Sequence, residues 1–531
     1  MKNLINEMKM PLLYSAVALA MLSAYHYWQD KHIKPPKSGK PDTEVVSHVD
    51  ENGHLVLGGM EKHGQHPVIN ISSDKLALTV DLVGGTIVGA SLPNYTQSLE
   101  DSTPVSVLTD KKDFQVVEYG LVGDYNVRFK VASKGLDLES GQDSLSVVLV
   151  GKSKDGIDIK KTLTLHRGRY DVSINTEAAN NTVNSWTGNF YQQIKRSEPT
   201  VEQGIGRRTY HGMSFYQEDK PYTKIDYSDM RKRDLNVNVK GGWVAGQQHY
   251  FLAALIAPQA LKQNFFSATQ DGDSRYILGM FSPKVTLEPK ESTEYPSKLY
   301  VGPEQVEVLN KLAPGLGMTI DYGFLWFLSE AMMWILKKIQ LLVNNWGVSI
   351  ILVTFVVKLL FYNFSNKSFR SMSKMSALAP KIKEIQDKYK DDKVKLQQEM
   401  MAFYSKEKIN PLSGCFPMLV QLPFFIALYW MIIESVELRQ APFFGWIHDL
   451  SVKDPMYVLP ILMGASMLVQ QLSSNSEGQD PSQRQMMLMV PIVFTFVFMN
   501  FPAGLVLYML TNNLLSMAQQ AWVKRQMANN G

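Results

Sequence analysis

The sequence predicts an α-helical polytopic membrane protein with six transmembrane helices and a large all-β sandwich domain outside the cytoplasm. Three observations predict this class. An apolar run lies near the amino terminus, short alternating strand patterns fill residues 68–303, and five further apolar runs follow residue 345. A chain of 531 residues also exceeds one ordinary globular core, so we expect at least two domains.

Composition excludes several classes of protein. A net charge of +4 and an aromatic content of 11% give no reason to expect a nucleic-acid-coating or disordered chain. Cys415 is the only cysteine, so an intrachain disulfide and a cysteine-based zinc or redox site are excluded. The sequence contains no HExxH, Walker A or GxSxG motif, and the ten histidines are scattered. We therefore expect no catalytic residues, cofactor or metal, and interpret His166 and His249, near predicted strands, as ordinary surface or packing residues.

The amino terminus predicts a membrane anchor over residues 1–29. Lys2 and Lys9 precede an apolar run from Met10 to Trp28 that ends in aromatic residues, which suit the lipid–water boundary. A cleaved signal peptide is the alternative, because the tripeptide at residues 18–20 resembles a cleavage site. We favour the anchor because this tripeptide lies inside the apolar run. Under either interpretation, the segment that follows is exported from the cytoplasm.

The next two regions differ in pattern. Residues 30–66 are rich in proline, glycine and charge without an apolar period, and they predict a linker. Residues 67–320 predict the β-sandwich, because short alternating strands are separated by turn residues. Examples are Leu76, Leu78 and Val80 before Gly84-Gly85, and Leu163, Leu165, Val172 and Ile174 around Gly168.

Residues 321–344 predict an amphipathic helix on the membrane surface. Leu328, Ala331, Met332, Ile335, Leu336, Ile339, Leu342 and Val343 gather on one side of a helical wheel, with Glu330, Lys337, Lys338 and Gln340 opposite. If this segment crossed the bilayer, the basic loop that follows would lie outside the cytoplasm, against the positive-inside rule.

Five later segments predict transmembrane helices, at residues 345–365, 413–434, 456–472, 486–501 and 502–523. The loop at 366–412 should be cytoplasmic, because between residues 366 and 410 it carries eleven lysines and arginines against six acidic residues. That assignment places both termini, the loop at 473–485 and the tail at 524–531 in the cytoplasm. The loop at 435–455 and the β domain are then periplasmic.

The basic loop itself predicts a helical hairpin. Apolar residues recur at three- and four-residue spacing from Met375 to Tyr389 and again from Leu396 to Tyr404, with a turn at residues 390–392. Pro380 marks either a kink in the first arm or the first residue of its regular helix.

Lys358 is the main anomaly of the apolar segments. A lysine at the bilayer centre costs about 2.5 to 3.5 kcal/mol on insertion scales, so it is expected to face a polar cavity. Lys358 lies roughly 9 Å from the cytoplasmic end of its helix, however, so snorkelling of the side chain to the membrane surface is an equal alternative.

The last apolar segment carries a polar stripe. Tyr508, Asn512, Ser516 and Gln519 recur at spacings of four, four and three and so share one helix face. Other apolar segments also carry polar residues, and together they could line a hydrated indentation that opens to the cytosol: Thr354, Lys358, Gln421, Glu434, Ser466, Gln470 and Gln471. Hydrogen bonding between helices of a closed bundle is the alternative. Sixteen of the 27 methionines lie from Met372 onward, and their flexible side chains suit a surface that accepts many apolar shapes.

Several short runs resemble the YidC insertases of Gram-negative bacteria. They include Tyr300-Val301-Gly302-Pro303-Glu304, Asn345-Trp346-Gly347, Gly414-Cys415-Phe416-Pro417, Trp446-Ile447-His448-Asp449-Leu450 and Gly504-Leu505-Val506-Leu507-Tyr508. The resemblance covers the whole chain, is densest after residue 300, and rests on many runs in the expected order.

The resemblance implies a five-helix insertase core, a periplasmic β-sandwich, and a hydrophilic groove open to cytosol and lipid. Leu422 and Phe425 match substrate contacts at this groove, while Thr354 and Tyr508 lie near it. The family has a groove arginine where this chain has Lys358, which keeps the positive charge but loses bidentate pairing. The implied partners are nascent membrane-protein segments, the lipid bilayer, Sec translocon components and translating ribosomes, with no sequence-specific nucleic acid.

Two other functions fit part of the pattern. The β domain could be the catalytic unit of a membrane-tethered carbohydrate-active enzyme, in which case deleting residues 68–300 would abolish activity. A transporter with a small-molecule site near Lys358 would instead give substrate-dependent flux in proteoliposomes.

Overall fold

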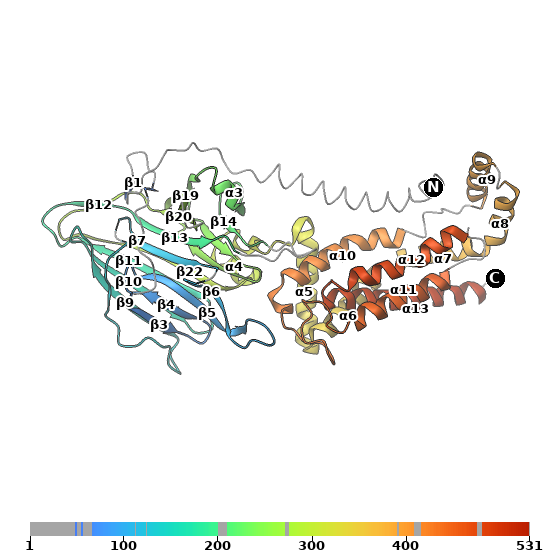
Figure 1. Cartoon of the computed structure of the whole chain (residues 1–531), viewed down its shortest axis with the longest axis horizontal. Helices are drawn as coiled ribbons and strands as arrows, with labels where there is room; N and C mark the ends of the chain where they lie inside the picture. The colour runs from blue at the N-terminus through green and yellow to red at the C-terminus, as the bar shows by residue number, and fades with distance from the viewer. Residues whose placement is uncertain are drawn as a thin grey trace. The chain divides into compact units, whose positions relative to one another are not determined.

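The computed structural model describes residues 48–49, 55–56, 66–111, 113–123, 125–199, 210–270, 275–389, 392–407, 416–474 and 481–529. The chain divides into two compact units, Met1–Thr319 and Ile320–Gly531, which are a β unit and a helical unit (Figure 1). The predicted anchor lies outside the described residues. Within the predicted linker, β1 (His48–Val49) and β2 (Leu55–Val56) form a short antiparallel pair where no regular structure was expected.

The β unit is built on two large antiparallel sheets. The first has the strand order β15 (Thr223–Ile225), β14 (Met213–Phe215), β17 (Trp243–Gln247), β18 (Phe251–Ile256), β22 (Ser292–Pro303), β11 (Asp171–Ala179), β10 (Asp158–His166), β9 (Ser144–Lys152) and β8 (Lys130–Val131). The second runs β16 (Asn236–Lys240), β19 (Lys262–Gln270), β20 (Arg275–Phe281), β13 (Phe190–Ser197), β7 (Gln115–Leu121), β5 (Thr86–Thr96), β4 (Ala77–Asp81) and β3 (Val68–Ser72), with β6 (Pro104–Leu108) beside β5. A third, small pair joins β12 (Trp186–Gly188) and β21 (Val285–Leu287).

The period-two pattern explains how these strands face the interior. In β10, Ile159, Leu163 and Leu165 are buried and alternate with more exposed neighbours. Leu163 lies opposite Val147 on β9 and Ile174 on β11, so the register places three apolar side chains in one row of the core. The predicted β-sandwich is confirmed, and the strand residues cited for it lie where the alternation placed them.

Short helices cover part of the first sheet. The described part of the β unit contains α3 (Tyr227–Met230), α4 (Val306–Leu312) and the 3₁₀ turn η1 (Leu316–Thr319). Leu309 and Leu316 pack in one buried cluster with Trp243 and Tyr300 of the sheet. The Trp243 indole N–H donates to the Pro314 carbonyl at 2.9 Å, which satisfies its one polar atom. The chain thus leaves the last strand through a segment that is packed onto the sandwich.

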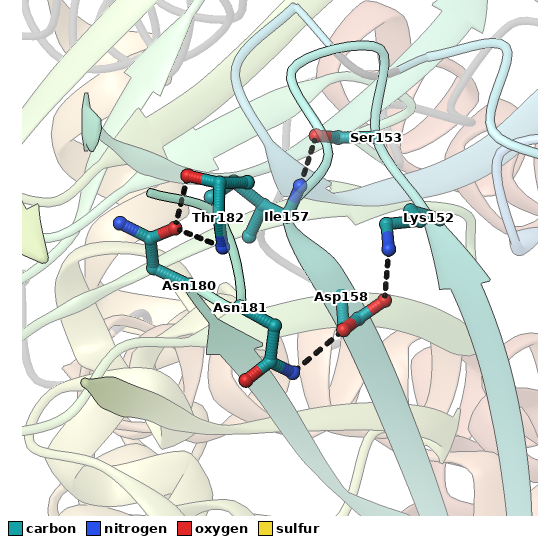
Figure 2. A network of polar contacts seen from close by, with 7 residues as sticks. All are labelled: Lys152, Ser153, Ile157, Asp158, Asn180, Asn181 and Thr182. Carbon is teal, nitrogen blue, oxygen red and sulfur yellow. Dashed lines mark hydrogen bonds and ion pairs between the residues drawn. The ribbon is translucent and has the colours of Figure 1, made fainter. Parts of the chain in front are cut away.

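One end of the first sheet is held by a polar network (Figure 2). The Asn181 amide donates to Asp158 at 2.7 Å, and the Lys152 ammonium lies 3.4 Å from the same carboxylate. The buried Asn180 side-chain oxygen accepts from the backbone N–H and the hydroxyl of Thr182. These bonds supply the turn after β11 with partners that no strand provides there. The Asn181 hydrogen bond lowers the pKa of Asp158 below its usual value, and Lys152 acts in the same direction.

The helical unit begins with η2 (Gly323–Leu325) and α5 (Trp326–Val343), followed by α6 (Trp346–Leu360), α7 (Tyr362–Ala377), α8 (Ala379–Lys388) and α9 (Lys393–Lys406). It continues with α10 (Phe416–Glu434), η4 (Val436–Leu438), α11 (Val458–Ser474), α12 (Pro481–Phe498) and α13 (Ala503–Asn529). In Figure 1, α6 and α10 to α13 run roughly side by side, whereas α5 crosses them and packs on α6 and α10.

The chain reverses sharply between α5 and α6. Asn344 ends α5 in the left-handed conformation with a φ of 50°, which asparagine tolerates better than most residues. Asn345 then caps α6, because its side-chain oxygen accepts from the Val348 backbone N–H at 3.0 Å. Two adjacent asparagines therefore set the corner.

The packed face of α5 matches the predicted apolar stripe only in part. Met332 and Leu336 are buried as expected, but Ser329 is also buried and donates to the Ala427 carbonyl of α10 at 2.9 Å. Ala331, which belongs to the predicted stripe, is exposed, and so is the large Trp334. The buried face of α5 therefore includes a satisfied polar contact with a neighbouring helix and does not coincide with the purely apolar side.

The helix predicted over residues 345–365 is interrupted. α6 ends at Leu360, and α7 starts at Tyr362 at an angle of 68° to it. The first predicted hairpin arm begins in the last turn of α7, at Met375, and continues as α8, while the second corresponds to α9. Pro380 lies in the first turn of α8, where its missing N–H costs no helical hydrogen bond. Among the described helices, none taken singly has the length and apolarity needed to cross a membrane, although α6 and Tyr362–Ser371 pass together as a bent pair. Six transmembrane helices therefore remain a prediction.

Candidate functional site

Lys358 lies on the packed face of α6. Thr354 and Ile350, one and two turns before it, are both buried, and Lys358 itself is half-buried. Its neighbours Phe355 and Leu359 are exposed. The lysine therefore points toward the other helices of the unit. A polar cavity between helices requires this direction, whereas a side chain that snorkels to the membrane surface would run along the exposed face.

The Lys358 ammonium reaches the last helix. It donates to the Ser516 hydroxyl of α13 at 2.7 Å, and that hydroxyl donates to the Asn512 backbone carbonyl at 2.7 Å. Among the described residues, no carboxylate lies within 4.0 Å of the ammonium. Lys358 thus carries its charge next to a neutral partner and keeps N–H donors that no described group occupies.

Asn512 offers an acceptor of its own. The residue is buried, and its side-chain oxygen has no hydrogen-bond partner within the described part of the chain. The adjacent Asn513 differs, because its amide donates to Ser466 of α11 at 3.3 Å. A buried amide oxygen without a partner costs about 1 to 3 kcal/mol, so this position is expected to receive a donor from water or a ligand.

Tyr508 and Gln421 link α13 to α10. The Gln421 amide donates to the buried Tyr508 hydroxyl at 2.7 Å. Gln421 lies directly before Leu422, whose side chain is exposed. The hydrogen bond therefore holds α10 beside the polar stripe, directly before Leu422, which is one of the two predicted substrate contacts. Gln421 belongs to the predicted indentation, and the structure identifies Tyr508 as its partner.

Phe425 is packed more closely than Leu422. Its ring meets Phe498 of α12 edge to face, with centroids 6.0 Å apart. Phe361, at the break between α6 and α7, makes a similar contact with Phe424 at 5.0 Å. Aromatic contacts with α12 and with the break between α6 and α7 thus support this part of α10. Of the two predicted substrate contacts, Leu422 is the more exposed.

Gln519 and Thr354 have partners that define their roles. The Gln519 amide donates to the Tyr362 carbonyl at 3.3 Å, so it satisfies a backbone group next to the break between α6 and α7. The Thr354 hydroxyl donates to the Ile350 carbonyl of its own helix at 2.7 Å. Of the predicted polar residues, Ser516 and Lys358 are in direct contact, while Thr354 and Gln519 flank them through backbone partners.

Two family models match almost the whole length of the described chain. One, described as the YidC periplasmic domain, matches residues 68–335, and one described as 60Kd inner membrane protein matches residues 338–530. The boundary between the two matches lies within α5.

Curated relatives match over both units. A protein of Coxiella burnetii named membrane protein insertase YidC is 40% identical over 550 residues, covering 98% of this chain and 96% of that protein. A Legionella pneumophila protein with the same name is 40% identical over 543 residues, covering 97% and 96%. One from Pseudomonas fluorescens is 42% identical over 479 residues, covering 86% and 84%.

Proposed function

The chain belongs to the YidC family of membrane protein insertases, and we propose that it inserts hydrophobic segments of other proteins into the inner membrane along the polar cluster around Lys358. The observation that carries this proposal is the direction of that side chain. Lys358 lies within an otherwise apolar helix, faces the other helices, and meets a neutral hydroxyl at 2.7 Å. A cation placed there is costly unless water or an anionic ligand reaches it.

The polar cluster supports a hydrated groove between α6, α10 and α13. Lys358 and Ser516 form one contact across it, Gln421 and Tyr508 form another, and Asn512 lies between them along α13 with an unpartnered oxygen. Polar groups on three helices lower the cost of bringing a substrate's own polar flank into the membrane, because they replace part of its hydration. No covalent step is required.

An apolar wall adjoins these polar groups. Leu422 is exposed on α10 directly after Gln421, and the partly buried Phe425 lies about one turn further along the same helix, with its ring packed on the buried Phe498 of α12. In the proposed mechanism the acidic or polar flank of an incoming segment is attracted by Lys358 while its apolar stretch slides along this wall into lipid. Burial of that stretch drives release at about 25 cal/mol per Å² of apolar surface.

The orientation follows from charge. The loop at residues 366–412 is placed in the cytoplasm with both termini, and the β unit in the periplasm. On α5, Trp326, Phe327 and Trp334 are exposed, which suits a helix lying at the membrane surface. Translating ribosomes and Sec translocon components are the proposed partners on the cytoplasmic and membrane sides, because they deliver unfolded apolar segments.

Replacement of Lys358 tests the proposal. In proteoliposomes containing the full-length chain, Lys358→Ala is expected to reduce insertion of a reporter with an acidic translocated tail by about tenfold, the equivalent of one charge-assisted hydrogen bond of roughly 1.4 kcal/mol. Lys358→Arg should preserve insertion because the charge remains. Protease protection of the tail measures insertion, and normal insertion by the alanine variant would contradict the charge role.

Crosslinking locates the path. A photoreactive residue at Leu422 is expected to capture the nascent chain of a translating ribosome, whereas one at the exposed Val183 of the β unit should not. Capture at Val183 alone would argue against the helical unit as the site of insertion.

A further inference from the structure

We infer that Ser516 is a positioning residue that holds the Lys358 ammonium on α13, so that the remaining N–H donors of the lysine meet an acidic group of the incoming segment. This inference rests on the proposed insertion function and adds a residue to it. The two residues are 158 positions apart in the sequence, and the Lys358 ammonium lies 2.7 Å from the Ser516 hydroxyl.

The direction of the Ser516 hydroxyl is fixed by its own helix. Its hydrogen is used in the bond to the Asn512 carbonyl, four residues earlier, at 2.7 Å. Only its lone pairs are then available to a second partner, so the serine accepts from a cation and does not compete for an incoming carboxylate as a donor. A hydroxyl free to rotate would lack this preference.

The lysine needs such an anchor. Its ammonium is a compact charge on a flexible stem, and rotation could carry it out of the site toward the membrane surface. A hydrogen bond to a charged group is strong enough to favour one rotamer by about tenfold. The ammonium has three donors, so it can keep Ser516 and bind a carboxylate at the same time.

Ser516→Ala tests the inference because it removes the acceptor and leaves the charge. Two reporters are compared in proteoliposomes, one with aspartates in the translocated tail and one with asparagines at the same positions. We expect Ser516→Ala to reduce insertion of the aspartate reporter by about five- to tenfold and to leave the asparagine reporter within about twofold. Ser516→Thr, which keeps a hydroxyl that can bond to its own helix, should restore insertion of the aspartate reporter.

Two controls separate positioning from general packing. Thr511 on the same helix also bonds to its own backbone, through the Leu507 carbonyl at 2.8 Å, and no described contact joins it to Lys358. Thr511→Val should therefore insert both reporters normally. In a Lys358→Met background, Ser516→Ala should have no further effect, because the two residues act as one unit.

Each contrary result has a distinct meaning. If Ser516→Ala inserts the aspartate reporter at the wild-type rate, or lowers both reporters equally, or still impairs insertion in the Lys358→Met background, Ser516 does not act through the ammonium and the inference fails while the insertion function stands. If the unmodified chain inserts neither reporter, the proposed function fails, and this inference fails with it.

Discussion

Two interior lysines show how surroundings decide the role of a buried charge. Lys161 is 2% exposed inside the β-sandwich, and its ammonium donates to the carbonyls of Gly84 and Tyr119 and lies 4.2 Å from the Tyr119 ring centre. Lys358 in the helical unit has a single hydroxyl as its described partner. The first cation is surrounded by acceptors and serves the fold. The second keeps N–H donors that no described group occupies.

Removal of the Lys161 ammonium should destabilise the β unit. Lys161→Met keeps a long side chain but leaves the Gly84 and Tyr119 carbonyls without that donor, and we expect a loss of about 2 kcal/mol in the free energy of unfolding. Thermal unfolding of the full chain, followed by the circular dichroism of its β-structure, measures this.

The neighbouring lysine provides the matched control. Lys160 is exposed and pairs with Glu177 at 3.0 Å on the outer side of the same strand. Lys160→Met is expected to change the stability by less than about 1 kcal/mol, because an exposed ion pair contributes little. Equal losses from the two substitutions would show that the inward position of Lys161 has no special importance.

His211 should make the stability of the β unit depend on pH. Burial, followed by the positive charge of Arg196, lowers the pKa of His211 to about 4. The unfolded chain takes up a proton as the pH falls below about 6.5, whereas the folded one does so only near pH 4. Neutral His211 therefore makes its whole contribution to the free energy of unfolding above pH 6.5. This contribution, at most about 3 kcal/mol, is lost as the pH falls toward 4.

A comparison of melting temperatures at pH 7 and pH 4.5 tests this dependence. His211→Gln removes the titrating group and should reduce the acid-induced loss of stability. If the His211 variant lost as much stability at pH 4.5 as the unmodified chain, the acid sensitivity would belong to other groups.

At the scale of single elements, sequence patterns predicted whether a segment forms a strand or a helix better than they predicted where that element bends or ends. The strands were predictable because alternation in segments such as β10 reports directly which side chains face inward. The hairpin arms also followed from local rules, which left Pro380 as either a kink or a helix start until the structure placed it in the first turn of α8. The break after Leu360 was not predictable, since no proline or glycine lies at residues 358–364 to interrupt the apolar run.

The residues at the break make contacts that are distant in sequence. Gln519 donates to the Tyr362 carbonyl from α13, and Phe361 packs against Phe424 of α10. Neither contact has a local signature. The same is true of the candidate site. The spacing of Tyr508, Asn512 and Ser516 predicted a shared polar face, but only the structure identified Ser516 as the partner of Lys358 and Gln421 as the partner of Tyr508.

At the scale of the whole chain, each unit has its own core and its own chemistry. The β unit is stabilised by the pairing and packing of its two sheets, and its interior is filled by residues such as Trp243 and Tyr300. The polar cluster of the helical unit comes from α6, α10 and α13 alone. Insertion is therefore expected to depend on the helical unit, with the β unit contributing a separate periplasmic role.

Deletion of residues 68–300 separates the two units. We expect the shortened chain to retain insertion of the aspartate reporter within a few-fold of the full chain, because every residue of the Lys358 cluster remains. In the shortened chain, Lys358→Ala should reduce insertion about as much as it does in the full chain, since the cation acts through α13 and the substrate. Complete loss of insertion by a shortened chain that still reaches the membrane would assign an essential part of the activity to the β unit, as an enzyme built on that unit would require.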